Sequence, residues 1–160
     1  MFRRAAWFAS IVLTALCLGP AMAHLLALPN KLRLSRDAYF TAQQIYRGWA
    51  WLGTVIAAAI LVTLVLAILE RRRAPLGLGA AAALSCLVAA QVVFWVFTFP
   101  ANQATRNWTV IPENWMQLRL RWEYSHALGA FLTLAALVVL VLSVTTRPPQ
   151  AEPGSARKAA

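Results

Sequence analysis

The chain has 160 residues, of which 61% are hydrophobic and 12% are charged, and its formal net charge is +10. A soluble globular domain is about one quarter charged, so the composition excludes an ordinary soluble domain. The basic residues lie at both ends of the apolar stretches instead of forming one patch, which argues against a nucleic-acid partner. We attribute the positive charge to membrane topology and to contact with anionic lipid.

Four long uncharged stretches predict four membrane-spanning helices, at residues 5–28, 48–69, 76–99 and 124–146. Each is longer than the ~20 residues that a helix needs to cross a bilayer core. A helix satisfies its own backbone hydrogen bonds in lipid, whereas an isolated strand or loop does not. The predicted fold is therefore all-α, an integral membrane four-helix bundle in residues 1–146 with both termini on one side. Residues 147–160 are rich in Pro, Ala and charge and predict a disordered cytoplasmic tail.

The first stretch also has features of a cleavable secretory signal, because Arg3 and Arg4 precede the apolar run and Ala21-Met22-Ala23 fits a cleavage site. The apolar run continues as far as Pro29, which is long for a signal peptide. We expect an uncleaved first helix, with removal of residues 1–23 as the alternative.

The orientation follows from basic residues beside the spans. Arg71, Arg72 and Arg73 lie in the short connection between the second and third spans, on the same side as Arg3 and Arg4. Lys and Arg beside spans favour the cytoplasm, so the sequence predicts a multi-pass protein of the cell (inner) membrane with both termini cytoplasmic.

The second and fourth helices are expected to extend beyond the membrane on the outer side. Ser35 is a suitable N-cap, and no helix breaker follows before Gly48, so the second helix is predicted to begin near Arg36. Pro112 suits a first helical turn, and no Gly or Pro follows before Gly129. Residues 100–111, between the third and fourth spans, are polar and are predicted to be irregular.

Tryptophans are concentrated on this outer half. Six of the seven lie there, namely Trp49, Trp51, Trp95, Trp108, Trp115 and Trp122. An interfacial belt is normally shared between both membrane faces, so the asymmetry indicates a packed outer cap or a ligand pocket. A belt combined with cap packing and no ligand is the alternative.

One stripe of the fourth helix carries most of the candidate chemistry. The stripe has spacings of four, three and four residues and consists of Trp115, Arg119, Trp122 and His126. Glu123 lies three residues before His126, which is the Glu-x-x-His spacing of helical metal sites. His24, near the outer end of the first span, is expected to reach the same layer.

His24, Glu123 and His126 are therefore candidate ligands for Fe, Cu or Zn. A second interpretation is a metal-free pocket in which His126 or His24 acts as a general base beside Arg119. A third is a purely structural polar network without a ligand.

The sequence resembles the anthrone-oxygenase-like family of small four-helix membrane proteins, long described as a domain of unknown function. The resemblance extends roughly over residues 23–144 and is carried by Pro100-x-Asn102 and Trp122-x-x-x-His126. The segments AHLLALPNK and QQIYRGW are similar to a bacterial-type branch. The resemblance implies oxygen-dependent oxidation of a hydrophobic substrate, with His126 as a functional residue.

Two functions are compatible with these patterns. The first is a membrane oxidoreductase, similar to a monooxygenase, that acts on a hydrophobic small molecule on the outer side of the bilayer. Its candidate catalytic residues are His126, His24 and Arg119, and its candidate substrate contacts are Trp115, Trp122 and Asn102. The alternative is a non-catalytic accessory or small-molecule-binding membrane protein with a structural polar cluster.

Overall fold

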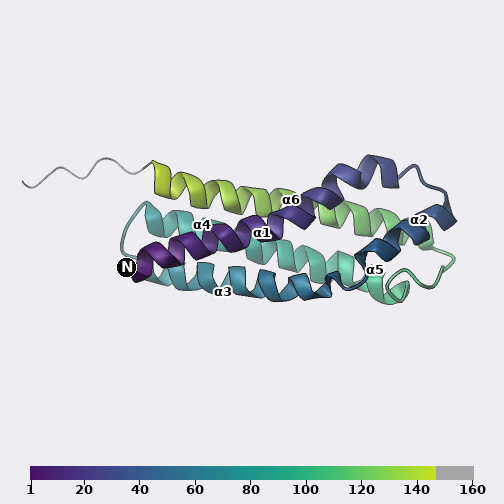
Figure 1. Ribbon diagram of the computed structural model, residues 1–160, viewed down its shortest axis with the longest axis horizontal. Helices are drawn as coiled ribbons and strands as arrows, with labels where there is room; N and C mark the ends of the chain where they lie inside the picture. Colours follow the sequence, from purple (N-terminus) through teal and green to yellow (C-terminus); the bar gives the residue numbers. More distant parts are fainter. Residues whose placement is uncertain (147–160) are drawn as a thin grey trace, which may run out of the picture.

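The computed structural model describes residues 1–146, so the predicted tail at 147–160 lies outside the described residues. Within residues 1–146 the chain is helical throughout, with turns between helices and no strand. The four long helices lie side by side and form an elongated bundle (Figure 1). The predicted all-α four-helix bundle is confirmed.

The bundle consists of α1 (Phe2–Lys31), α3 (Leu52–Glu70), α4 (Leu76–Val93) and α6 (Trp115–Thr145). The helix of α4 continues through a π-helical turn, η3 (Phe94–Thr98), into α5 (Phe99–Ala104). All four are long and apolar enough to cross a membrane, which is the architecture of a multi-pass membrane protein. Helix α1 contacts α3 and α6, and α4 contacts the same two helices, so the bundle closes as a ring.

We call the two ends of the bundle the terminal end and the cap end. The terminal end contains the start of α1, the end of α6 and the turn between α3 and α4 (Figure 1). The cap end is covered by α2 (Arg36–Gln43) and by residues 105–114.

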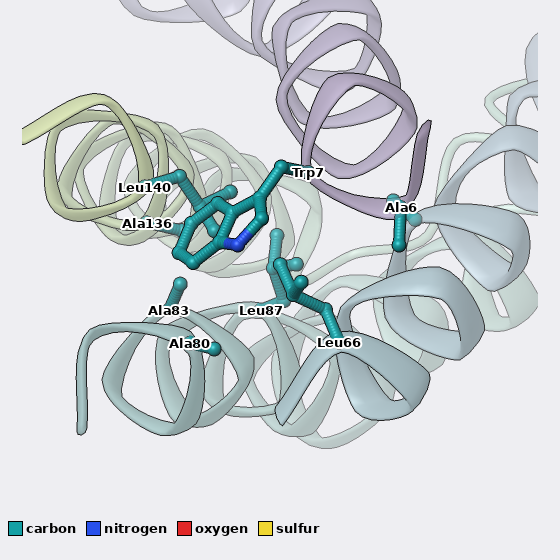
Figure 2. Close-up of a cluster of buried hydrophobic side chains, with 9 residues drawn as sticks. Ala6, Trp7, Leu66, Ala80, Ala83, Leu87, Ala136 and Leu140 are labelled. Carbon is teal, nitrogen blue, oxygen red and sulfur yellow. The ribbon is translucent and has the colours of Figure 1, made fainter. Parts of the chain in front are cut away.

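Small residues allow the helices to approach closely at the terminal end. Ala80 and Ala83 of α4 and Ala136 of α6 belong to one buried cluster, and the indole of Trp7 points into the space between the helices (Figure 2). Lipid tails are as apolar as Leu, so the hydrophobic effect does not drive helices together within a bilayer. Van der Waals contact between closely packed small residues stabilises the association of the helices instead. Trp7, only 5% exposed, fills the volume that the alanines leave.

Two pairs of hydroxyl groups link helices inside the bundle. Ser10 of α1 lies 2.7 Å from Thr63 of α3, and Thr98 of η3 lies 2.7 Å from Ser125 of α6. Such hydrogen bonds between membrane helices contribute on average about 0.6 kcal/mol each. Their main consequence is to fix the rotation of each helix about its own axis.

The segment after α1 differs in part from its prediction. Helix α2 begins at Arg36, as predicted, and the Ser35 hydroxyl accepts a hydrogen bond from the Ala38 backbone N–H. The predicted continuous second helix is wrong. The chain passes through two short 3-10 turns, η1 (Gln44–Tyr46) and η2 (Trp49–Trp51), and Gly48 between them has a φ of 88°. A left-handed residue cannot continue a right-handed helix, so α2 and α3 are separate.

Helix α6 extends beyond its apolar stretch toward the cap, as predicted, but it begins at Trp115, so the prediction that Pro112 lies in its first turn is wrong. The expectation of irregular structure from residue 100 is wrong for its first part, because Pro100 lies in the first turn of α5, where it needs no backbone N–H. The turn that follows contains three consecutive left-handed residues, at Arg106, Asn107 and Trp108. Trp108 is 4% exposed, so this strained turn carries a buried indole into the cap.

Candidate functional site

Two histidines from opposite ends of the sequence meet inside the bundle. The ring centroids of His24 on α1 and His126 on α6 are 4.3 Å apart. His24 is 6% exposed and His126 is half-buried. The prediction that both rings share one layer near the cap end is confirmed. We call these two residues the histidine pair.

Aromatic rings surround the histidine pair on its cap side. The ring of Tyr46 lies 4.4 Å from that of His24, and the Trp49 ring lies 5.6 Å from it. The Trp122 ring lies 4.0 Å from His126 and 5.0 Å from His24. Tyr46 was not among the predicted site residues, because its position depends on the turn at Gly48 that interrupts the helix.

The hydrogen bonds of the pair leave ring nitrogens available. His126 Nδ1 lies 2.9 Å from the backbone carbonyl of Trp122, which can only accept, so Nδ1 carries the proton. The Nε2 atom of a neutral His126 is then an acceptor with a free lone pair. His24 Nδ1 is buried and has no hydrogen-bond partner among residues 1–146. Buried polar atoms normally have a partner, so the pair has unused hydrogen-bonding capacity.

The histidine pair lines a cavity of about 190 Å³ between the bundle helices. Apolar side chains such as Val55, Ile56 and Leu87 form much of its wall. The polar side chains that line it besides the histidines are Gln91, Thr98, Ser125 and Thr133. The π-helical turn η3 contributes Thr98, and single π-helical turns of this kind are frequent at functional sites.

A second group of polar side chains, which we call the cap cluster, lies beside the histidine pair and consists of Lys31, Tyr39, Gln43, Arg119 and Glu123. Lys31 Nζ is 2.7 Å from Glu123 Oε2, and the Tyr39 hydroxyl donates to Glu123 Oε1 at 2.9 Å. Gln43 Nε2 in turn donates to the Tyr39 hydroxyl. Burial, together with the charge of Glu123, raises the pKa of Tyr39. The cluster thus ties α1, α2 and α6 together.

Arg119 belongs to the cap cluster and does not line the cavity. Its guanidinium donates to the backbone carbonyls of Lys31 at 2.7 Å and Leu34 at 3.0 Å, and its carbon atom Cζ lies 4.8 Å from the centroid of the Tyr39 ring. Lys31 is the last residue of α1 and its carbonyl also accepts from the Leu34 backbone N–H at 3.3 Å, so Arg119 adds a second donor there and holds the turn that follows α1. This geometry gives Arg119 a structural role and does not support the predicted catalytic one.

The predicted substrate contacts also separate into two groups. Trp122 touches both histidines, whereas Trp115 packs in the cap against Phe40. The Asn102 side-chain oxygen accepts from the indole N–H groups of Trp122 at 2.8 Å and Trp108 at 3.2 Å. Asn102 therefore positions Trp122, and neither of these two residues lines the cavity.

The predicted three-ligand metal site is not assembled. His24 and His126 meet, but both carboxylate oxygens of Glu123 are engaged by Lys31 and Tyr39. In the part of the chain that the structure describes, no three His, Cys, Asp or Glu side chains are grouped as metal ligands. The three-residue spacing puts Glu123 almost one helical turn closer to the cap than His126. The residues present do not fit a three-ligand metal centre.

No family model matches this chain, and neither the curated proteins nor the solved structures contain a significant match.

Proposed function

We propose that this multi-pass membrane protein binds a small, mainly apolar molecule in the bundle cavity, and that the histidine pair binds a polar group on that molecule. The observation that carries the proposal is the unused hydrogen-bonding capacity of two imidazoles, His24 buried and His126 half-buried, beside a largely apolar cavity. Ligand pockets typically combine apolar walls with a few polar groups that fix the orientation of the ligand.

The size of the cavity restricts the ligand. An apolar cavity of about 150 Å³ is sufficient to bind benzene. A cavity of about 190 Å³ therefore suits a single substituted ring, with a hydroxyl or carbonyl group directed to the histidines. The three fused rings of an anthrone exceed this volume, so a substrate of that class would extend beyond the cavity.

A pair of probe molecules tests the proposal directly. We expect 4-fluorophenol to bind the purified protein, followed by its fluorine NMR signal, more tightly than fluorobenzene after correction for partition into detergent. In the His24→Leu/His126→Leu variant, the affinity for 4-fluorophenol should fall up to about tenfold, the value of one lost hydrogen bond, and that for fluorobenzene should not change.

The control is Ser85→Ala, on the exposed face of α4, which should leave both affinities as they are. Equal losses for both probes in the double histidine variant would remove the hydrogen-bonding role of the pair. Absence of binding to the unchanged protein would exclude the cavity as a ligand site.

A catalytic role is the second candidate, favoured by the free Nε2 lone pair of His126. This nitrogen lies beside a largely apolar cavity, where it can act as a general base and take a proton from a bound phenol. The resemblance to the anthrone-oxygenase-like family adds oxygen as the oxidant of the resulting anion. With a 1,4-dihydroxybenzene the step balances: the phenol loses two electrons and two protons and becomes a quinone, while oxygen is reduced to hydrogen peroxide. The chain would then be a membrane oxidoreductase.

Oxygen consumption by the purified protein with a set of single-ring phenols tests this second candidate. We expect His126→Gln, which keeps a hydrogen-bonding side chain but not the base, to abolish protein-dependent oxygen uptake without lowering the thermal unfolding temperature. If the unchanged protein consumes no oxygen with any of these phenols, catalysis of this class is excluded and ligand binding alone remains.

The proposed location is the cell (inner) membrane, with the terminal end in the cytoplasm. The support is the position of Arg3, Arg4 and the three arginines of the α3–α4 turn, all of which lie at the terminal end. The histidine pair then lies in the outer half of the bilayer, where a hydrophobic ligand can reach it from the lipid.

A further inference from the structure

A second cavity lies at the terminal end, far from the histidine pair along the bundle. It has a volume of about 500 Å³ and is lined by the first residues of α1 and by the end of α3. Its charged side chains are Arg3, Arg4, Glu70 and Arg73, and its apolar ones include Trp7 and Leu69. None of these residues takes part in the site proposed above.

Glu70 is the unusual member of this lining. It is 1% exposed, and among the described residues its one ion-pair partner is Arg3, whose Nη1 lies 3.8 Å from Glu70 Oε2. That distance is too long for a hydrogen bond. Arg3 Nη1 is itself buried and makes no hydrogen bond within residues 1–146. A buried carboxylate without a hydrogen-bond donor is costly, so Glu70 lacks a donor that a ligand could supply.

The remaining charges of the cavity lining are positive and therefore suit an anionic group on the ligand. Three guanidinium groups and the N-terminal ammonium of Met1 line the cavity together with one carboxylate, so the cavity carries an excess of positive charge. Guanidinium is the side chain best suited to phosphate, because its planar donors bind two oxygens at once. The cavity therefore presents donors for a phosphate and an acceptor for a cation in the same space.

We propose that the terminal-end cavity binds a phosphate ester that carries a primary ammonium group, such as the headgroup of phosphatidylethanolamine. The phosphate lies among Arg3, Arg4 and Arg73, and the ammonium donates to Glu70. Trp7 and Leu69 provide an apolar wall for the glycerol end of the lipid. Basic pockets between membrane helices on the cytoplasmic side bind lipid headgroups, and here the buried carboxylate adds selectivity for an amine.

Stepwise methylation of the headgroup amine tests the proposal without changing the protein. Binding of lipids with identical acyl chains to the purified full chain is measured by native mass spectrometry. We expect affinity to fall in the order phosphatidylethanolamine, its monomethyl and dimethyl derivatives, and phosphatidylcholine, because each methyl group removes an N–H donor. The first and last should differ at least fivefold. Equal binding of the first and last lipid would overturn the proposal.

Two variants and one control test which side chains bind the ammonium and the phosphate of the headgroup. Glu70→Gln should abolish the discrimination between phosphatidylethanolamine and phosphatidylcholine, whereas Arg73→Gln should weaken both several-fold. Arg72→Gln removes the same charge from an exposed neighbour that does not line the cavity, and should change neither. If Glu70→Gln keeps the discrimination, or if phosphatidylglycerol binds the unchanged protein more tightly than phosphatidylethanolamine, the ammonium site does not exist.

Competition with soluble O-phosphoethanolamine distinguishes a free phosphate ester from a membrane lipid as the ligand. If it displaces the lipid at millimolar concentration, the headgroup alone is sufficient, and a free phosphate ester is also a ligand. If it does not displace the lipid, the acyl chains contribute to binding and the ligand is a membrane lipid.

Discussion

Glu123 is the residue on which the cap cluster depends. Its carboxylate comes from α6, the ammonium of Lys31 comes from the end of α1, and the hydroxyl of Tyr39 comes from α2. Lys31 and Glu123 are 6% and 1% exposed, so neither charge has bulk water as an alternative partner. Removing one charge therefore leaves the other buried and unpaired.

We expect Lys31→Met and Glu123→Gln each to lower the free energy of unfolding by about 3–5 kcal/mol. The double variant should lose much less than the sum, because no unpaired charge remains. Unfolding in detergent by a denaturant series measures all three. The exposed pair Arg36 and Asp37, at 2.9 Å, is the control, and its variants should change stability by about 1 kcal/mol or less. Additive losses at Lys31 and Glu123 would contradict the pairing.

Tyr39 gives the cap cluster a dependence on alkaline pH. Burial and Glu123 raise the pKa of Tyr39 in the folded protein above the ordinary tyrosine value of about 10. Above pH 10 the unfolded chain therefore releases a proton that the folded chain keeps, and stability decreases as pH rises. Tyr39→Phe should flatten this decrease between pH 9 and about 11. Tyr124→Phe, on the exposed face of α6, should leave it unchanged, and an unaltered slope in Tyr39→Phe would contradict the assignment.

At the scale of elements, the positions of the helices could be predicted from the sequence more fully than the partners of their side chains. The Ser35 cap and the extension of α6 were predictable, because capping and helix breaking are local. The partners of Glu123 were not. Lys31 and Tyr39 reach it only because the chain turns back after α1 and lays α2 across the cap. The left-handed conformation of Gly48 was not predictable either, because it depends on where α2 must end.

Helices α4 and α6 pack closely at Gly79. A Cβ atom there would collide with the side chain of Ser143. We expect Gly79→Ala to lower the unfolding free energy by about 1–3 kcal/mol, as overpacking does, and Ser143→Ala in the same chain to restore part of the loss. Gly53→Ala, where nothing lies within 4 Å, is the control and should be neutral or slightly stabilising. Thermal unfolding of the four proteins measures the differences, and a neutral Gly79→Ala would show that the helices can separate there.

At the scale of the whole molecule, hydropathy was sufficient to predict four helices, since a chain in lipid must satisfy its backbone within helices. The meeting of His24 and His126 was predictable from the alternating direction of the spans. The cavity was not, because it arises where small residues of several helices face one another, among them Ala21, Ala90 and Gly129. Sequence patterns describe one helix at a time, whereas a cavity is a property of all four.

Cysteine labelling tests the orientation of the molecule in the membrane. In a chain with Cys17 and Cys86 changed to Ala, we introduce one cysteine, either Arg72→Cys at the terminal end or Glu113→Cys at the cap end, both at exposed positions. A membrane-impermeant maleimide should label intact cells only at position 113 and lysed cells at both. Labelling only at 72 would invert the proposed orientation, and labelling of both in intact cells would contradict the four-span topology.

The bond from Arg119 to the end of α1 sets an order for biosynthesis. The carbonyls of Lys31 and Leu34 accept from a side chain that is synthesised 88 and 85 residues later. The end of α1 is closed locally, since the Lys31 carbonyl also accepts from the Leu34 backbone N–H at 3.3 Å, but its two bonds to Arg119 can form only after α6 has been made. Arrival of α6 adds these bonds and, through Glu123, the ion pair with Lys31. A nascent chain that ends before Trp115 consequently lacks all three contacts.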